Sequence, residues 1–398
     1  MVSQSREDAA LARSQKKIIA ACYYAFLVNG FLSLMMGSVL PMLREQYSLP
    51  YQISGSLLSA HSVGNLISSF AAGTLPVYMG RKNAIMLLCL GGVLGYFLMT
   101  ATGNPIFLLL AFFLIGITRG GITNLNNTVV SDLSGGKSSA LNFLHAVFAV
   151  GAFLCPFAAM IFTSRFENGW KYAAVFVSVL CAFIILFFGA SPLDNQPRLK
   201  KENRKFSYAF LKDKTFVIST GLLFFYLCTE SCVNGLLVTY FADSGIVSPS
   251  YAQGLLSLLW LVIMLGRLTV AALSEKLGKR RILIATCFGA ALFYVLLMLS
   301  RTALSVTVCL VGFGYCLAGI YPTTIANVSQ YTSAYPMAMG TITTIAGLGS
   351  ITMPVVAGAV ADRTNIWGGM ALVTVAVVLM TGCAISNYFL KREKASST

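Results

Sequence analysis

The chain has 398 residues, of which 57% are hydrophobic and only 10% are charged, and its mean hydropathy is +0.77. This composition excludes an ordinary soluble globular protein and predicts a polytopic membrane protein with the lipid bilayer as its surroundings. The formal net charge is +15. Because the basic residues fall in the connections between apolar stretches, the charge does not indicate a nucleic-acid partner.

The apolar stretches predict about twelve membrane-spanning helices, since a helix needs about 20 residues to cross the hydrocarbon core. The first six are expected, after a basic tail, near residues 18–43, 52–77, 83–102, 105–132, 138–163 and 170–191. The second six are expected near 215–241, 251–275, 282–300, 302–329, 336–361 and 367–390. The predicted fold is an all-α membrane protein with an N-terminal half (1–191), a basic cytoplasmic linker (192–214) and a C-terminal half (215–398).

The distribution of Lys and Arg predicts the topology. If the N-terminus is cytoplasmic, the inner segments hold 21 of the 28 basic residues, the outer connections hold 5, and Arg119 and Arg267 remain inside spans. Basic residues concentrate on the cytoplasmic side of membrane proteins. Both termini and the linker are therefore expected in the cytoplasm, in a plasma membrane or, for a prokaryote, the inner membrane.

The two halves of the sequence match each other at a constant offset of 198 residues. Such an offset, kept over five helices, indicates a duplicated six-helix unit. The matched pairs are Gly37 and Gly235, Ser59 and Ser257, Gly80 and Gly278, Gly116 and Gly314, Gly121 and Gly319, Ala140 and Ala338, Gly151 and Gly349, and Pro156 and Pro354.

The seventh predicted span carries a carboxylate, Glu230, near its middle. At helical spacing, Tyr226, Glu230 and Asn234 fall on one face, each one turn from the next. A charge inside the hydrocarbon region is costly, so it is kept where it faces a partner or a wet cavity, and it marks a functional site by default.

The cytoplasmic turns between the second and third spans of each half carry a glycine followed by two basic residues, Gly80-Arg81-Lys82 and Gly278-Lys279-Arg280. With two six-helix halves and a basic linker, this pattern resembles the major facilitator superfamily, whose signature runs roughly G-x-L-x-D-R-x-G-R-R/K. In the first half Val77 and Tyr78 stand at its acidic and basic positions, and the second half has Glu275 and Lys276 there. The resemblance implies a cytoplasmic latch made by Gly80, Arg81, Arg267, Glu275 and Gly278.

A narrower resemblance is to the fucose-proton symporter family and its relatives. It is carried by GITRGGITNLNNTVVSDL, ALNFLHAVFAVGAFLCP, FYLCTESCVNGLL and GFGYCLAGIYPTTIANVS. Asn127, Asn142 and the pair Tyr321-Pro322 fall on family-like positions, and His145 completes the pattern L-N-x-L-H. The resemblance implies a transporter of polar solutes.

The sequence departs from that family at two acidic positions. The acid expected in the first span is Gly37, and the acid expected in the fourth span is Thr123. Both carboxylates that the family links to protonation and sugar recognition are missing. Glu230 is left as the main central carboxylate.

Polar side chains form stripes on several predicted helices. Amide and hydroxyl groups buried in lipid need partners, and the alternatives are contacts between helices or the lining of a binding cavity. For the stripes together, we expect a cavity that binds a hydroxyl-rich solute. The expected substrate-binding residues are Asn29, Ser33, Arg119, Thr123, Asn127, Asn142, His145, Tyr226, Glu230, Asn234, Tyr321 and Asn327.

The sequence allows more than one role for each charged or titratable residue inside the spans. Glu230 is expected to carry a proton or to gate the pathway, and the alternative is a fixed ion pair with Arg119. Arg119 either clamps an anionic solute or neutralises Glu230. His61 and His145 are candidates for proton handling, because histidine changes charge near physiological pH.

No enzyme motif or cofactor site is found in the sequence. SGGKSS, at residues 134–139, has Ser131 where a P-loop requires glycine, and the 10 cysteines lack metal-site spacing. We therefore expect a monomeric secondary transporter, most favourably one that takes up a sugar or polyol with a proton. The alternatives are an exporter of amphipathic or drug-like compounds, a uniporter or transporter of an organic anion bound by Arg119, and, from another class, a membrane receptor or enzyme.

Overall fold

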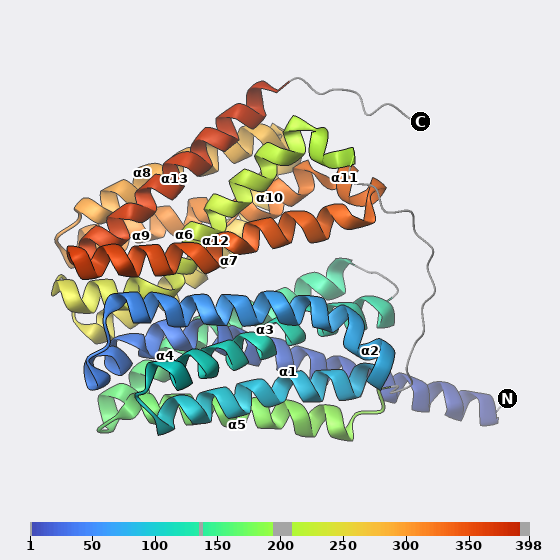
Figure 1. Cartoon of the computed structure of the whole chain (residues 1–398). Helices are drawn as coiled ribbons and strands as arrows, with labels where there is room; N and C mark the ends of the chain where they lie inside the picture. The colour runs from blue at the N-terminus through green and yellow to red at the C-terminus, as the bar shows by residue number, and fades with distance from the viewer. Residues whose placement is uncertain (1, 135–137, 194–208, 391–398) are drawn as a thin grey trace. The chain divides into compact units, whose positions relative to one another are not determined.

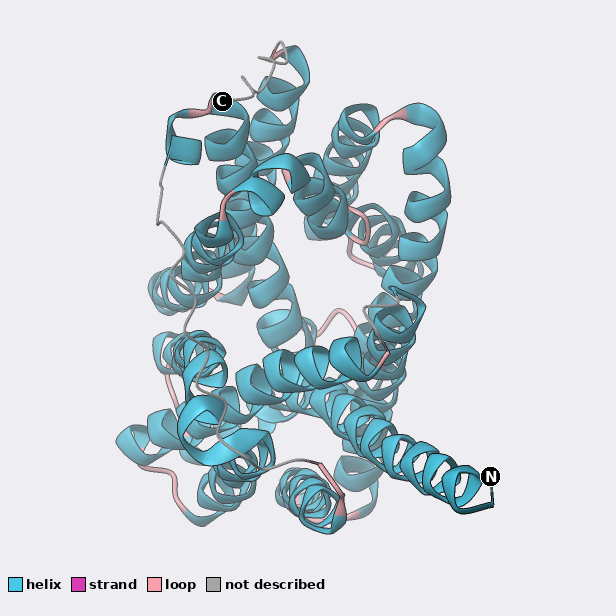
Figure 2. Cartoon of the chain, turned by 90° about the vertical axis from the view of Figure 1, so that its right-hand side faces the viewer, coloured by secondary structure: helices cyan, strands magenta, loops and turns pink. Residues whose placement is uncertain are grey.

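The structure, a computed structural model, describes residues 2–134, 138–193 and 209–390. Within these ranges it leaves undescribed the side chains of residues 2–13, 138, 139, 142, 271, 272, 274–276, 332–334, 336 and 337. All regular elements in the described ranges are helices, and no strand occurs among them (Figure 2). The prediction of an all-α protein is confirmed.

The first part of the chain forms α1 (Val2–Tyr47), α2 (Tyr51–Ala101), α3 (Pro105–Leu133), α4 (Ser138–Arg165) and α5 (Gly169–Ala190) (Figure 1). The second part begins with the 3-10 turn η1 (Ala209–Lys212) and continues with α6 (Lys214–Ser244), α7 (Pro249–Leu277), α8 (Lys279–Leu299), α9 (Ala303–Leu317), α10 (Ile320–Asn327), α11 (Ser329–Ala334), α12 (Pro336–Arg363) and α13 (Ile366–Phe389). Most of these bounds lie within a few residues of the predicted spans, but α1 begins at Val2, whereas the first span was expected to begin near residue 18 after a basic tail.

Eleven candidate spans are present in the described residues, and one of them is double. α2 has 51 residues, which at 1.5 Å per residue is roughly 77 Å, more than twice the thickness of the hydrocarbon core. Its backbone turns at Gly80, where φ is 78° and ψ is 162°. Because a glycine readily adopts positive φ, Gly80 divides α2 into the predicted second and third spans, and the described residues hold twelve spans.

The chain divides into two compact units. The first contains residues 1–202 and, from the second half of the sequence, Asn234–Trp260. The second contains Asn203–Val233 and Leu261–Thr398. The unit boundaries cross α6 between Val233 and Asn234, and α7 between Trp260 and Leu261.

Equivalent glycines make equivalent helix crossings in the two halves of the sequence. A Cβ on Gly151 of α4 would lie 2.0 Å from the carbonyl oxygen of Leu27 in α1. A Cβ on Gly349 of α12 would lie 2.3 Å from the carbonyl oxygen of Phe224 in α6. Such close backbone approach requires glycine and is typical of membrane helix pairs. The two glycines are 198 residues apart and the two carbonyls are 197 residues apart, so the crossings follow the repeat to within one residue.

The tenth span differs from the single helix expected over 302–329. It is divided into α9 and α10, with Ala318 and Gly319 between them. Pro322 has no N–H to donate to the carbonyl of Ala318, and its ring clashes with that carbonyl in a regular helix. The break therefore lies one turn before Pro322.

An aromatic cluster joins η1 to the helices around it in the second unit. Phe210, 2% exposed, packs with Phe216 and Tyr331, and Tyr321 packs against the same cluster. Asp213 accepts from the backbone N–H of Thr215 at 2.7 Å, at the start of α6. Burial, followed by the contact with Asp213, raises the pKa of Tyr331 to about 12. The Tyr331 phenol therefore stays protonated at neutral pH.

Candidate functional site

The carboxylate at the centre of α6 lies beside two tyrosines of the second unit. The Tyr226 hydroxyl donates a hydrogen bond of 2.8 Å to Oε1 of Glu230. Tyr226 is only 2% exposed, and Glu230 is half-buried. The ring of Tyr321, from α10, lies 5.8 Å from that of Tyr226 at an angle of 52°. The structure therefore joins three residues predicted for the site, which we call the carboxylate cluster: Tyr226, Glu230 and Tyr321.

A cation from α7 acts on the same cluster. The Arg267 guanidinium interacts electrostatically with the Tyr226 phenol, and Arg267 is half-buried. The sequence assigned Arg267 to the cytoplasmic latch, together with Glu275, whose side chain lies outside the described residues. Arg267 thus lies within electrostatic range of Tyr226 in the carboxylate cluster.

A second polar group, in the first unit, is centred on Arg119 of α3. Its Nε donates to Oγ of Ser33 at 2.8 Å. Asn29 Nδ2 donates to Oγ1 of Thr123 at 2.9 Å, and the Thr123 hydroxyl donates to the carbonyl of Arg119 at 2.9 Å. We call these four residues, from α1 and α3, the guanidinium cluster. The helical stripes predicted on the first and fourth spans therefore face each other.

Asn234 lies in the first unit although it is only one turn from Glu230. Its Oδ1 accepts from Nε1 of Trp260 at 3.2 Å, and the Trp260 ring lies 5.7 Å from that of Phe148 in α4. A Cβ on Gly37 would lie 2.1 Å from the carbonyl oxygen of Asn234. At this position, where the resembled family has an acid, the chain has a close helix crossing that admits only glycine.

The two histidines have different surroundings. His61 is 8% exposed, and its Nε2 has no hydrogen-bond partner in the part of the chain that the structure describes. It also lies within electrostatic range of Arg119. His145 is exposed on α4, with its ring 5.5 Å from that of Phe26. His61 is thus the histidine associated with the guanidinium cluster.

The three remaining asparagines are distributed over separate places. Asn327, in α10, donates from Nδ2 to Oδ1 of Asn387 at 3.2 Å, and Asn387 donates to Oγ of Ser219 at 2.8 Å. These bonds connect helices of the second unit. Asn127 is half-buried on α3, one turn from Thr123. The side chain of Asn142 lies outside the described residues.

Basic residues next to Gly80 and Gly278 contact helix ends in both halves, Arg81 of the predicted latch in the first half and Lys279, which was not predicted for it, in the second. Arg81 pairs with Asp132, at the end of α3, at 2.6 Å, and the glycine before it, Gly80, is buried. At the equivalent place in the second half, Lys279 Nζ donates to the carbonyl of Ala326, at the end of α10, at 2.9 Å. The preceding Gly278 has φ 86°. Basic side chains at helix C-termini satisfy free carbonyls and complement the helix dipole.

Sequence reasoning missed the residues of an ionic group in the first unit altogether. Arg44, at the end of α1, pairs with Asp243, at the end of α6. Tyr51 also donates to Oδ2 of Asp243, at 2.7 Å, and the Arg44 guanidinium lies 4.1 Å from the Tyr51 ring centroid. The sequence repeat offered one indication of this group. Adding the 198-residue offset to Arg44 gives position 242, next to Asp243, so both residues lie at the same end of equivalent helices.

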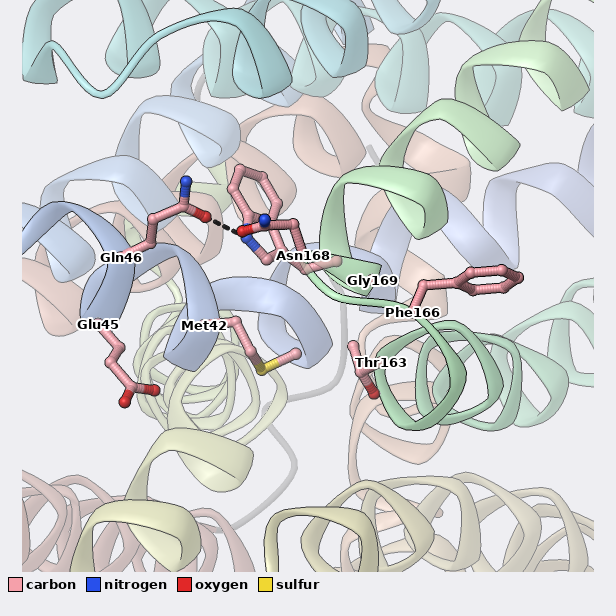
Figure 3. A pocket seen from close by; sticks show the side chains of 8 residues that line it. Met42, Glu45, Gln46, Thr163, Phe166, Asn168 and Gly169 are labelled. Carbon is pink, nitrogen blue, oxygen red and sulfur yellow. Dashed lines mark hydrogen bonds between the residues drawn. The ribbon is translucent and has the colours of Figure 1, made fainter.

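A cavity of about 360 Å³ opens at the Tyr47 end of α1, also in the first unit (Figure 3). Gln46 accepts a hydrogen bond of 2.7 Å from Nε1 of Trp170 at its edge, and Glu45 is its one carboxylate. It belongs to neither cluster. Its lining residues are Met42, Glu45, Gln46, Thr163, Phe166, Asn168, Gly169 and Trp170.

Comparison with known proteins agrees with this architecture. A homolog of the protein TsgA from Yersinia enterocolitica is 22% identical over 391 residues, covering 93% of this chain and 95% of that protein. The sodium-dependent glucose transporter 1A of Mus musculus is 20% identical over 376 residues, which cover 84% of this chain and 88% of that protein.

Solved structures share the fold at lower identity. One crystal structure of the nucleoside transporter NupG superimposes with a TM-score of 0.80 at 13% identity, covering 94% of this chain and 100% of that chain. A bacterial homolog of the human lysosomal transporter Spinster, in an inward-facing and unoccupied conformation, superimposes with a TM-score of 0.79 at 12% identity. The match covers 94% of this chain and 97% of that chain.

The twelve apolar spans of the described residues, with polar and titratable side chains inside them, are typical of a polytopic membrane transporter. The family model of the Major Facilitator Superfamily matches residues 22–331 and 220–398. The chain belongs to this superfamily, as its cytoplasmic motif predicted, and it is a transporter of small solutes rather than an enzyme.

Proposed function

We propose that the protein takes up a sugar or polyol together with a proton, and that Glu230 carries the proton. The observation that carries this proposal is the carboxylate of Glu230, held by Tyr226 at 2.8 Å in the middle of an apolar span. A carboxylate inside a membrane protein is kept for function by default. Its alternate protonation gives the transporter a way to couple solute movement to a proton gradient.

The substrate class is supported by the guanidinium cluster. Asn29, Ser33 and Thr123 supply amide and hydroxyl groups from two facing helices, and such groups form hydrogen bonds with hydroxyl-rich solutes. The named relatives and structural neighbours include a glucose transporter and a nucleoside transporter. Both names refer to solutes that contain a sugar.

Arg119 supports a second candidate substrate, an organic anion. Its guanidinium is oriented by the bond from Nε to Ser33. Guanidinium groups bind carboxylate and phosphate in a bidentate manner. An anionic solute, such as a sugar acid, would then be bound through Arg119 as well as through hydroxyl groups.

The remaining parts of the proposal concern organisation and location. We propose two six-helix halves, 1–191 and 215–398, joined by the linker 192–214, and a monomer with both termini in the cytoplasm. The equivalent glycine crossings and the distribution of basic residues support this arrangement. The bacterial relatives favour the inner membrane.

The test is uptake into proteoliposomes of a panel of labelled sugars, polyols and sugar acids. Each solute is assayed without a gradient, with an imposed proton gradient and with a sodium gradient, because one relative is named sodium-dependent. We expect accumulation of a neutral sugar or polyol that responds to the proton gradient. Accumulation that follows only sodium, or transport of sugar acids alone, would contradict the proton coupling or the neutral substrate, respectively.

A further inference from the structure

Tyr226 is placed where it acts on Glu230 rather than on a solute. Its side chain is only 2% exposed, so its ring is not available to stack on a bound solute. Its hydroxyl is used in the bond to Oε1 of Glu230. Both observations indicate that Tyr226 acts on the neighbouring carboxylate of Glu230.

The hydrogen bond distinguishes the two protonation states of Glu230. A hydroxyl donates more strongly to a charged carboxylate than to a neutral carboxyl group. A hydrogen bond to the charged form therefore favours that form. Removing the donor must make protonation of Glu230 easier.

The ring of Tyr226 is held in place by α10. Tyr321 lies 5.8 Å from it and itself packs against the aromatic cluster around Phe210. The start of α10, and with it the position of Tyr321, follows from the helix break before Pro322. The donor hydroxyl is therefore held in place by packing within the second unit.

We propose that Tyr226 is a positioning residue whose hydroxyl stabilises the charged form of Glu230 and so sets the pH at which this carboxylate takes up its proton. The inference rests on the proposed role of Glu230. In the second unit, the groups around Glu230 are Tyr226 on its own helix, Tyr321 on α10, and Arg267, which acts on Tyr226 from α7. In the proton step, the carboxylate binds a proton from water, and Tyr226 keeps its own.

The experiment measures protonation of Glu230 directly, without a known substrate. The full-length protein in nanodiscs is treated with a hydrophobic carbodiimide, which modifies protonated carboxyl groups, at a series of pH values, and labelling of Glu230 is read by mass spectrometry. We expect Tyr226→Phe to move the labelling midpoint about one pH unit to the alkaline side. An unchanged midpoint would overturn the inference.

The matched control is Tyr294→Phe, which removes the hydroxyl of another buried tyrosine of the second unit. Tyr294 donates to the carbonyl of Met370 at 2.9 Å, and we expect its loss to leave the labelling midpoint unchanged. An equal shift in this control would also overturn the inference, because the effect would then be structural. Should Tyr226→Phe fail to fold, Tyr321→Leu, which removes the bracing ring together with its hydroxyl, is expected to give a smaller shift in the same direction, and no shift would overturn the inference.

The proposed function is tested separately in the same preparation. If Glu230→Gln still accumulates solute in response to a proton gradient, the proposed function fails whatever the labelling shows. If Glu230→Gln loses that response but Tyr226→Phe retains the wild-type midpoint and shows a raised KM for solute, Tyr226 contacts solute and only the inference fails.

Discussion

The carboxylate cluster of the second unit and the guanidinium cluster of the first occupy related places in the sequence repeat but carry opposite charges. The 198-residue offset pairs Glu230 with Leu32 and Arg119 with Leu317. The glycine crossings at Gly151 and Gly349, in contrast, are similar, since each glycine lies against a backbone carbonyl of the first helix of its half. The comparison indicates that duplication kept the helix packing while the chemistry of the two halves diverged.

The packing side of this comparison predicts the largest effects. Gly151→Val and Gly349→Val each place a side chain against a backbone carbonyl, at 2.0 and 2.3 Å for the Cβ atom. Because the backbones must separate, we expect each variant to lose about 3 kcal/mol or more of stability. Size-exclusion chromatography of fluorescently tagged protein would show little folded material for both.

The matched controls use the same substitution at open positions. A Cβ at Gly340, on the same helix as Gly349, or at Gly73 of α2 meets nothing within 4 Å. We expect Gly340→Val and Gly73→Val to fold nearly as well as wild type. A large difference between Gly151→Val and Gly349→Val would break the claim that the packing is symmetric.

The chemical side of the comparison predicts an intermediate effect at Arg119. Lysine keeps the charge but lacks the planar fork that bonds Ser33 through Nε. We expect Arg119→Lys to raise the KM for solute roughly tenfold, since one charge-assisted hydrogen bond is worth about 1.5 kcal/mol or more. Unchanged uptake and affinity would make Arg119 a structural counter-charge only.

The helix-end contacts predict the smallest effect. Arg81 pairs with the half-exposed carboxylate of Asp132, whereas Lys279 contacts a carbonyl. Exposed ion pairs contribute roughly 0–1 kcal/mol and are screened by salt. We expect Arg81→Gln and Lys279→Gln each to lower Tm by a few degrees at most, with only the Arg81 effect shrinking at high salt. If the change in Tm depended equally on salt in both variants, the proposed difference between the ion pair of Arg81 and the carbonyl contact of Lys279 would be wrong.

The sequence was sufficient to predict the fold because apolar length and periodicity determine membrane spans almost completely. Even the break of the tenth span could have been predicted from Pro322. The faces of single helices were also predictable, and the contact between Tyr226 and Glu230 is a plain consequence of their one-turn spacing.

Partners on other helices could not be predicted from one sequence, because helical spacing gives a face and not its neighbour. Asn327 looked like a cavity residue, yet it bonds Asn387. Asn234 bonds Trp260, and Asp132 pairs with Arg81, although neither pairing is visible in the sequence. Such contacts depend on the rotation and depth of each helix, which packing determines.

The role of Glu230 as the proton carrier is tested most directly by comparing two modes of transport in Glu230→Gln. One is accumulation of labelled solute driven by a proton gradient, and the other is exchange of labelled for unlabelled solute without net proton movement. We predict that Glu230→Gln keeps exchange near the wild-type rate and loses accumulation. Accumulation at the wild-type level by Glu230→Gln would contradict the account.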